Sequence, residues 1–579
     1  PMPNVEKLAA DGVTFEHAFS CAPVCSVART TLATGCYGPR IGTQFHRKYK
    51  APPMPEGVRM FSAVLKQAGY YCTNRSKTDY AVKPGPGVWD MSSNKASWRN
   101  RPRPDQPFFH MESHGVSHES SLHFNRNVYE TQKTSTDPAS VQPAPYLPDT
   151  PLVRYTHARY HDRMKSVDGI VGQTIGKLKE DGVLEDTFVF YFGDHGGVLP
   201  RSKGYPYESG LHVPLVIRIP ENFKHLVDGK RGDRVDGFVN FADFGPTAIH
   251  LAGIPLPDGI DGRPFLGKGV SMKEVNARDE AFGYADRFDE KYDFRRSLRK
   301  GRYHYIRNYQ PWLPDSLNNN YRYKMLAFAE WRDLHKAGKL SGPQAQFFAA
   351  KGPEELYDVE ADPHEINNLA HDSKHAGTLH DLRTRLQQKL KALPDLSFYP
   401  ESKLCREAMN NPVAYGQQHK ADIVGLIDTA DLALQPFAEA RPALEKALAS
   451  KNDMTRYWAA MVCSSFGKDA ATLADQVKAL LKDTGPVVRM RAAEFLGLIG
   501  KQNPQPVLTD IVNTTRDPFE ATEALNSIVY FRDELKNGYA IEVKDLKPIG
   551  GADVNDRINY LKGTPYPPKK KRKPKKKKT

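Results

Sequence analysis

Hydrophobic residues recur along this chain with two different periods, and each period predicts a different element. Between residues 164 and 178 apolar side chains return at steps of three and four, at Met164, Val167, Val171, Ile175 and Leu178. That spacing places them on one face of a helix that packs on a sheet. The run 187–192, by contrast, is apolar at nearly every position. Such a run predicts a central strand of a parallel sheet that is covered on both faces.

Shorter patterns continue the alternation of strands and helices through the first two thirds of the chain. A second apolar run at 213–218 predicts another buried strand, and residues 300–307 alternate in the way that is typical of an edge or antiparallel strand. The remaining segments are predicted as helices at 5–10, 62–68 and 243–253, and as strands at 12–15 and 70–73. Together these elements indicate an α/β fold.

The last third of the chain differs, because its apolar patterns predict helices without strands. Segment 455–467 lines up with segment 488–500 at an offset of 33 residues, and a looser third copy runs from 519 to 531. A helical unit of this period resembles HEAT repeats, in which stacked units bury one another's apolar faces. A simple helical bundle is the alternative. Since two or three units make a small solenoid, we expect these helices to pack on the preceding α/β part of the chain or on a partner.

Composition and charge narrow the classes of protein that remain. A length of 579 residues predicts two or more domains, and no apolar run of about 18 residues suggests a membrane span. Of the net charge of +14, nine units come from the Lys and Arg residues of 569–578, which leaves +5 for the rest of the chain. We therefore expect no specific nucleic-acid partner. The tail cannot fold alone; we expect a disordered segment that binds anionic polymer, with a nuclear or nucleic-acid patch as the alternative.

The stretch 19–35 carries the chain's strongest candidate chemistry. Cys25 and Arg29 lie four residues apart, and a helix that begins after Pro23 and ends at Gly35 would place both on one face. The start of a helix offers free N–H groups and a partial positive charge, which suit an anion. A buried cysteine that merely packs is the alternative. The six cysteines show no zinc spacing, and one disulfide, for example between Cys36 and Cys72, is possible.

The same stretch is similar to the signature of the type I sulfatases, Cys-x-Pro-x-Arg followed by Leu-x-Thr-Gly. Here it is Cys25-Ser26-Val27-Ala28-Arg29 and then Leu32-Ala33-Thr34-Gly35, with Val27 at the family's proline and Ala28 at its second serine. In that family a formylglycine-generating enzyme oxidises the cysteine to formylglycine, whose hydrate attacks sulfur. The resemblance implies the same modification of Cys25, with Arg29 beside it and the modifying enzyme as a partner.

A candidate metal site follows the apolar run 187–192. Asp194 and His195 lie there between glycines, and ligands of α/β proteins gather at the carboxyl ends of strands. The Asp194 carboxylate is the hard oxygen ligand that calcium prefers. The resemblance implies that Asp194 and His195, together with residue 25, bind Ca²⁺. The Asp-His-Gly run, Lys203 and the Glu-Ser-Gly before strand 213–218 together make a specific match to the family.

Four further side chains receive roles from the resemblance. Lys77 and Lys203 match lysines that bind the sulfate, and His118 matches a histidine that protonates the leaving oxygen. Asp79 stands where the family has a histidine; it contacts a sugar hydroxyl, pairs with a cation or marks a changed site. Without the resemblance, Lys77 is equally well a surface lysine and His118 a structural histidine. A zinc-protease motif is excluded, because His123 comes one residue too late.

The resemblance covers residues 1–395 and implies an alkaline-phosphatase-like mixed sheet sandwiched by helices, then a small antiparallel subdomain closed by a helix at 379–393. The predicted divisions are a catalytic domain at 1–290, its C-terminal subdomain at 291–395, a linker at 396–430, HEAT-like repeats at 431–545 and a disordered basic tail at 560–579. The chain's first residues resemble the interior of a sulfatase domain. We therefore expect an N-terminal strand with a metal-binding Asp pair, and a signal peptide, to lie outside this sequence.

The implied function is hydrolysis of a sulfate ester on a sulfated carbohydrate, by an exported enzyme that acts in the periplasm or outside the cell. Two alternatives stay open. One is a phosphoesterase or phosphonate hydrolase of the same superfamily. The other is a non-catalytic, glycan-binding homologue, which Val27 and Asp79 favour and which Cys25, Arg29 and Lys203 oppose.

Overall fold

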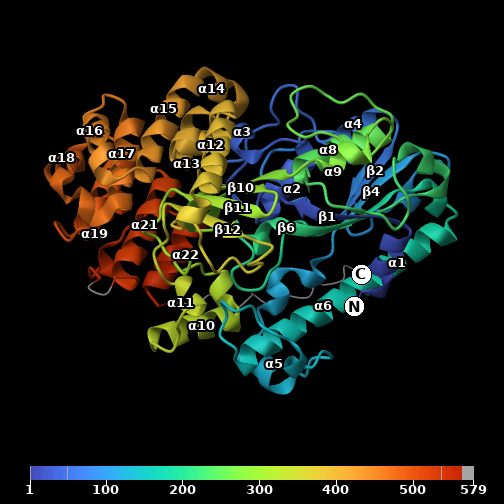
Figure 1. The fold of residues 1–579 in the computed structure, drawn as a ribbon, viewed down its shortest axis with the longest axis horizontal. Helices are drawn as coiled ribbons and strands as arrows, with labels where there is room; N and C mark the ends of the chain where they lie inside the picture. The colour runs from blue at the N-terminus through green and yellow to red at the C-terminus, as the bar shows by residue number, and fades with distance from the viewer. Residues whose placement is uncertain (1, 48–49, 536–537, 564–579) are drawn as a thin grey trace, which may run out of the picture.

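The computed structural model describes residues 2–47, 50–535 and 538–563. A mixed α/β part forms one side of the molecule, and a stack of helices from the last third of the chain lies against it (Figure 1). This arrangement confirms the predicted α/β architecture with a helical C-terminal region. Among the described helices, none is both long enough and apolar enough to cross a membrane.

The main sheet is mixed and has five strands. Its order is β5-β6-β1-β7, and β8 also pairs with β1. The strands are β1 (Gly12–Phe19), β5 (Val189–Phe192), β6 (His212–Arg218), β7 (Arg234–Val235) and β8 (Val239–Asn240). β1 runs antiparallel to β6 but parallel to β7 and β8. Helices α2, α4 and α8 lie above β1 and β6 in the view of Figure 1, and α1 and α6 lie below them.

The prediction that run 187–192 forms a central parallel strand is wrong. β5 pairs antiparallel with β6 and ends the strand order of its sheet. All four of its residues are half-buried. Uniform apolar character reports that both faces are partly covered, but it carries no information on the direction of the neighbouring strand.

A second, three-stranded parallel sheet has the order β3-β2-β4. Its strands are β2 (Tyr71–Arg75), β3 (Met91–Ser92) and β4 (Phe108–Glu112). The other elements of the α/β part are α1 (Pro3–Ala10), α2 (Cys25–Thr34), α3 (Gly38–Ile41), α4 (Phe61–Gln67), α5 (Arg126–Thr131), α6 (Pro151–Glu180), α7 (Glu208–Leu211), α8 (Phe241–Leu251) and α9 (Met272–Asn276). The Asp168 carboxylate of α6 accepts hydrogen bonds from the backbone and side chain of Asn4, at 2.9 and 2.8 Å, and so ties α6 to α1.

An antiparallel sheet in the order β12-β11-β10-β9 follows the main sheet in sequence. Its strands are β9 (Glu280–Phe288), β10 (Lys291–Lys300), β11 (Tyr303–Asn308) and β12 (Glu354–Asp358), with α10 (Leu326–Lys336) and α11 (Pro343–Gln346) between the last two. The predicted boundary at residue 290 therefore falls at the turn between β9 and β10, inside one sheet. Helix α12 (Ala376–Ala392) packs through buried leucines every three or four residues, as its pattern predicts.

The segment 396–430 is not a linker. It forms α13 (Glu401–Glu407), α14 (Pro412–Gln418) and α15 (Lys420–Ala430), and Leu404, Ile423 and Leu426 are completely buried. Pro412 occupies the first turn of α14, where a backbone N–H has no partner within the helix, so proline loses no hydrogen bond there. The prolines that suggested a linker are therefore helix starts.

The remaining helices form the stack in orange and red of Figure 1. They are α16 (Phe437–Leu448), α17 (Asp453–Phe466), α18 (Ala474–Ala479), α19 (Pro486–Leu498), α20 (Gln505–Thr514), α21 (Pro518–Asp533) and α22 (Ala552–Leu561). The three copies of the predicted repeat fall on α17, α19 and α21. Of the predicted tail, residues 564–579 lie outside the described residues, and residues 560 and 561 end α22.

None of the six cysteines forms a disulfide, so the pairing considered between Cys36 and Cys72 does not occur. Five of the six are buried. Burial raises the pKa of Cys36 and of Cys72 to about 12, which keeps both thiols protonated and unreactive.

Candidate active site

Helix α2 is the centre of the site. It begins at Cys25, after Val24 in extended conformation, and it ends at Gly35, whose left-handed φ of 69° favours glycine. All ten of its residues are buried. Cys25 therefore lies at the helix N-terminus and Arg29 one turn further along, as the sequence predicts, although both are inside the protein.

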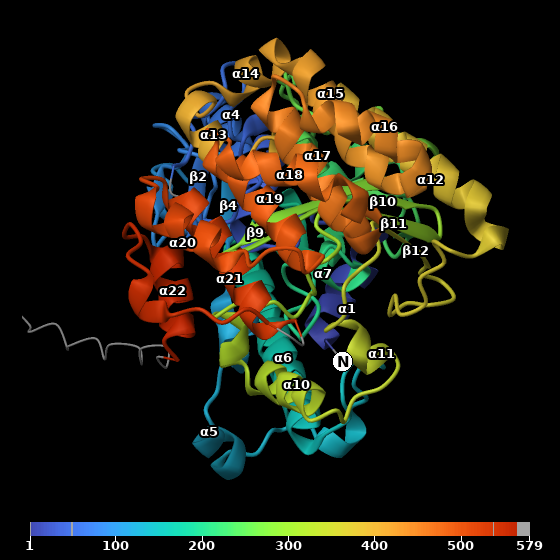
Figure 2. The same ribbon diagram turned by 90° about the vertical axis from the view of Figure 1, so that its left-hand side faces the viewer.

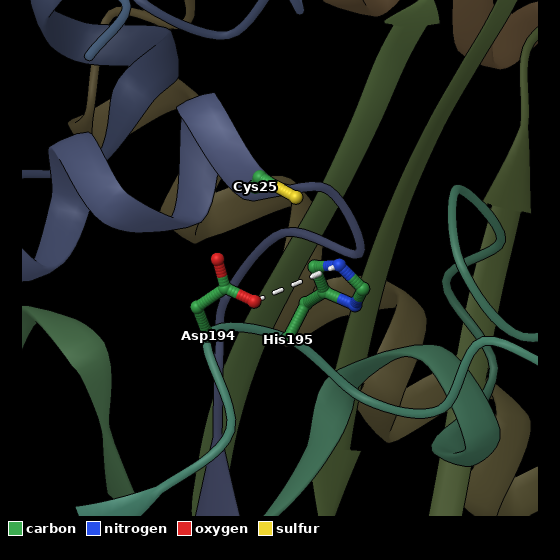
Figure 3. Close-up of side chains that lie close together, drawn as sticks. All are labelled: Cys25, Asp194 and His195. Carbon is green, nitrogen blue, oxygen red and sulfur yellow. Dashed lines mark ion pairs between the residues drawn. The ribbon is translucent and has the colours of Figure 1, made fainter. Parts of the chain in front are cut away.

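The loop after β5 brings Asp194 and His195 to Cys25. Figure 3 shows these three side chains pointing toward one another, and their ligand atoms all lie within 4.8 Å of one another. Among the described residues, no other group of three His, Cys, Asp or Glu side chains meets this criterion. The loop approaches its neighbours so closely that a Cβ at Gly196 would lie 2.5 Å from the Ser209 carbonyl oxygen. Glycine is therefore required there.

The Asp194 carboxylate joins the predicted cations into one cluster. Its Oδ2 atom lies 2.7 Å from Lys77 Nζ and 3.8 Å from an Arg29 nitrogen, and its Oδ1 atom lies 3.8 Å from His195 Nε2. Burial alone would raise the pKa of Asp194, but His195, Lys77 and Arg29 hold that pKa well below its usual range. The carboxylate is therefore ionised, as a metal ligand must be.

Lys203 and His118 lie next to each other, and both act on Cys25. Lys203 Nζ lies 3.4 Å from His118 Nε2 and 3.7 Å from a carboxylate oxygen of Glu119. His118 Nδ1 lies 2.9 Å from the hydroxyl of Ser120, which fixes the ring orientation. Burial and Asp194 favour the neutral thiol of Cys25, yet His195, Lys203 and a hydrogen bond with His118 hold its pKa well below the usual range.

Asp79 is paired with cations, which was one of the outcomes considered for it. Its carboxylate lies 3.9 Å from Lys77 Nζ and 3.8 Å from Arg47. Its backbone is strained, with a φ of 36°. The structure thus brings all eight predicted residues into one connected cluster: Cys25, Arg29, Lys77, Asp79, His118, Asp194, His195 and Lys203.

Three residues of the cluster were not identified from the sequence. Glu119 is 1% exposed and faces both Lys203 and His123; its position next to His118 was the available signal. His46 lies 2.7 Å from the Ser26 hydroxyl, next to Cys25, and no sequence pattern marks it. Tyr321 packs on both His118 and His123 from a distant part of the chain.

Comparisons with known proteins agree on one family. The sulfatase family model matches residues 1–83 and 72–254, and a model of HEAT repeats matches residues 441–528. An ulvan-active sulfatase from Formosa agariphila is 35% identical over 452 residues, which cover 70% of this chain and 74% of that one. Human N-sulphoglucosamine sulphohydrolase is 24% identical over an alignment that covers 66% of this chain and 84% of that one.

Among solved structures, the phosphonate monoester hydrolase of Silicibacter pomeroyi superposes with a TM-score of 0.48 at 18% identity. The superposition covers 69% of this chain and 92% of that one.

Proposed function

This chain belongs to the sulfatase family and is a sulfuric ester hydrolase, and from that premise we propose that it removes sulfate from a sulfated carbohydrate with a formylglycine nucleophile at position 25. The observation that carries the proposal is the convergence of Cys25, Asp194 and His195, with Lys77 and Arg29 on the same carboxylate. The names of the ulvan-active and N-sulphoglucosamine relatives support a carbohydrate substrate.

The donor set supports a divalent cation and fits calcium in part. Asp194 offers the hard carboxylate oxygen that calcium prefers, whereas the sulfur of Cys25 is a soft ligand. Oxidation of Cys25 to formylglycine would replace that sulfur by oxygen and improve the fit. Asp194, His195 and residue 25 would hold the ion. When bound, it would polarise a sulfate oxygen.

Charge balance gives a second reason to expect a cation. The cations Arg29, Lys77 and Lys203 face the carboxylates Asp79, Glu119 and Asp194, so the described cluster has little net charge of its own. A sulfate ester is an anion, and its hydrolysis gathers further charge on the nonbridging oxygens. Once a metal ion is bound to Asp194, the side chains that now face carboxylates would be able to bind those oxygens: Arg29, Lys77 and Lys203.

We propose that His118 acts on the leaving group. The oxidised residue 25 would supply an oxygen nucleophile for attack on sulfur. His118 would deliver a proton from its ring to the departing sugar oxygen and would regain a proton from water after the product leaves. Glu119, buried beside Lys203, would keep the lysine charged and in place.

Replacing Cys25 tests this function. The Cys25→Ala variant should lose turnover of 4-nitrophenyl sulfate by at least ~10³-fold, because it removes the nucleophile. Cys21→Ala is the matched control: Cys21 is equally buried, burial raises its pKa to about 12, and its loss should leave turnover within ~3-fold. Retained activity in Cys25→Ala would contradict the proposal. Faster turnover of 4-nitrophenyl phosphate than of the sulfate would favour the phosphoesterase alternative.

The identity of the metal is tested by removal and return. Treatment with a chelator should lower turnover and the melting temperature together, since a ligand that binds only the folded state at ~100 times its Kd adds about 2.7 kcal/mol. We propose that Ca²⁺ restores both and that Mg²⁺ restores less, because Mg²⁺ is smaller and demands octahedral geometry. Equal recovery with Mg²⁺ would contradict the calcium assignment.

We also propose that the enzyme is exported and that its basic tail, 569–578, binds the anionic substrate polymer. A highly charged polysaccharide does not cross a membrane unaided, so an enzyme that acts on it works outside the cytoplasm. Nine clustered positive charges attract a polyanion in a salt-dependent manner. Deleting 565–579 should weaken binding to a sulfated polysaccharide at low salt and leave turnover of 4-nitrophenyl sulfate unchanged.

A further inference from the structure

The aromatic ring of Tyr321 lies against two histidines near Lys203, His118 and His123. Its ring centroid lies 4.7 Å from that of His123 and 6.4 Å from that of His118, in edge-to-face arrangements. Lys203 Nζ lies 5.5 Å from the same centroid. Phe288 packs edge-on at 6.0 Å and supports the ring from β9. Tyr321 is only half-buried, so part of it remains available for contact.

The Tyr321 hydroxyl has no hydrogen-bond partner among the described residues. A buried polar group without a partner is unfavourable, so a bound molecule that offers an oxygen would be stabilised there. Burial raises the pKa of Tyr321, and Glu119 and Cys25 raise it further. The hydroxyl is therefore neutral: it can donate a hydrogen bond and does not repel an anion.

The segment that carries Tyr321 is held by the last described helix of the chain. The side-chain amide of Asn320 donates to the Asp556 carbonyl of α22 at 2.7 Å, and the Asn320 backbone N–H donates to Glu290 at 2.6 Å. Arg557 of α22, which is completely buried, donates to the Asn318 carbonyl at 2.6 Å. Residues 318–320 are thus fixed on both sides of their backbone.

Helix α21 contacts the partners of this segment through Asn526, which bonds both Glu290 and Arg557. The Asn526 amide donates to the Glu290 carbonyl at 2.7 Å, and its oxygen accepts a hydrogen bond from Arg557. In Figure 2, α21 and α22 lie together on one side of the molecule. The helical stack therefore reaches the site through one continuous chain of contacts, from Asn526 and Arg557 through segment 318–320 to Tyr321.

We propose that Tyr321 is a substrate-binding residue that contacts the sugar ring next to the sulfate, and that α22 positions it through Asn320. The proposal rests on the sulfatase function proposed above and adds a residue and an element to it. A pyranose ring has an apolar C–H face that suits an aromatic ring, and its hydroxyl and ring oxygens suit the neutral Tyr321 hydroxyl. The helical extension is in this view a part of the substrate-binding apparatus.

Two substrates separate this role from general catalysis. With ulvan-derived oligosaccharides as the sugar probe, Tyr321→Ala should lower kcat/KM by ~10-fold, mainly through KM, because one aromatic contact and one hydrogen bond are lost. With 4-nitrophenyl sulfate, which lacks the sugar, Tyr321→Ala should lower kcat/KM by a clearly smaller factor, ~3-fold, because only the packing on His118 and Lys203 is disturbed. Tyr321→Phe should lose only the hydroxyl contribution. Equal losses on both substrates, or no loss on the oligosaccharides, would overturn the proposal.

The positioning role is tested by a double-mutant cycle. Asn320→Ala should lower kcat/KM for the oligosaccharides by ~3-fold and should add little in the Tyr321→Ala background, because both changes act through one contact. Asn513→Ala is the matched control, because the Asn513 amide also donates to a backbone carbonyl, that of Asp545 at 2.8 Å, and Asn513 is not part of the segment 318–320. This variant should leave kcat/KM for the oligosaccharides unchanged. Additive effects of Asn320→Ala and Tyr321→Ala would overturn the positioning role.

The two levels of the proposal fail in different ways. If the wild-type enzyme hydrolyses 4-nitrophenyl sulfate but not the oligosaccharides, the assignment of Tyr321 to a sugar ring is overturned and the sulfatase function stands. If neither substrate is hydrolysed, the proposed function itself is contradicted.

Discussion

The active-site cluster and the helical stack both bury charged side chains, but they pair them differently. In the stack, the Arg491 guanidinium contacts Glu494 at 2.9 Å and Tyr457 at 3.2 Å and also pairs with Glu523, and each of the three charged side chains is at most 5% exposed. In the active site, Lys77 and Arg29 share one carboxylate, Asp194, which is 29% exposed.

The difference separates structural charges from functional ones. The ion pairs of Arg491 are closed, because the three charged side chains face one another inside the fold and water is excluded. The pairs on Asp194 are open: Arg29 lies 3.8 Å from Asp194, and an ion or a sulfate oxygen can replace these partners. Removing a charge from the stack should therefore change stability, whereas removing one from the site should change turnover.

Replacing His118 should have the largest effect that discriminates between substrates. In His118→Gln, kcat for a sugar sulfate should fall ~10²–10⁴-fold, because a poor leaving group depends on general-acid catalysis. The loss with 4-nitrophenyl sulfate, whose leaving group is good, should stay below ~10-fold. His114→Gln in the same segment is the control, because His114 pairs with Glu112 and is not one of the cluster residues; it should affect both substrates equally. Equal losses in His118→Gln would rule out its role as the acid.

A pair of arginine-to-lysine changes tests the comparison itself. Arg29→Lys keeps the positive charge but loses the planar guanidinium, which can donate two parallel hydrogen bonds to a sulfate. We therefore expect kcat to fall ~100-fold with little change in the melting temperature. Arg491→Lys should do the reverse, because it breaks buried pairs worth about 2–4 kcal/mol of the free energy of unfolding and leaves the site intact. Steady-state kinetics and thermal unfolding of both variants measure this. A large loss of stability in Arg29→Lys would contradict the distinction.

The pH dependence of stability gives the smallest predicted effect. Burial, opposed by Arg491 and reinforced by Glu494, raises the pKa of Glu523 from 4.5 to about 7. Because the folded state binds this proton more tightly, the contribution to stability is complete below pH 4.5 and is lost as pH rises through about 7. Relative to Glu523→Gln, the wild type should therefore gain about 1–3 kcal/mol between pH 7 and 4.5. Urea unfolding across this range measures the difference, and a constant difference would contradict the expected titration.

The local elements of the site were predictable from short-range signals. Gly35 marks the end of α2 and thereby fixes Cys25 and Arg29 on one helix, and the apolar run before Asp194 predicts a strand that ends at the site. These signals lie within a few residues of the elements that they define. The family resemblance supplied the roles of Lys77 and His118, which no local pattern carries.

Long-range contacts were not predictable in the same way. The direction of β5 depends on its partner β6, and the helices of 396–430 depend on burial against other elements, so propensity and prolines alone led to wrong predictions. Tyr321 reaches His118 across about two hundred residues of chain. Its segment is irregular and has no periodicity, so only the folded structure identifies it.

The most direct test is mass spectrometry of the peptide that contains residue 25, taken from the enzyme produced together with a formylglycine-generating enzyme. The account predicts that residue 25 carries an aldehyde, despite Val27 at the position of the family's proline, and that the aldehyde fraction scales with the rate of 4-nitrophenyl sulfate hydrolysis. An unmodified Cys25 thiol in protein that still hydrolyses the sulfate at the full rate would contradict it.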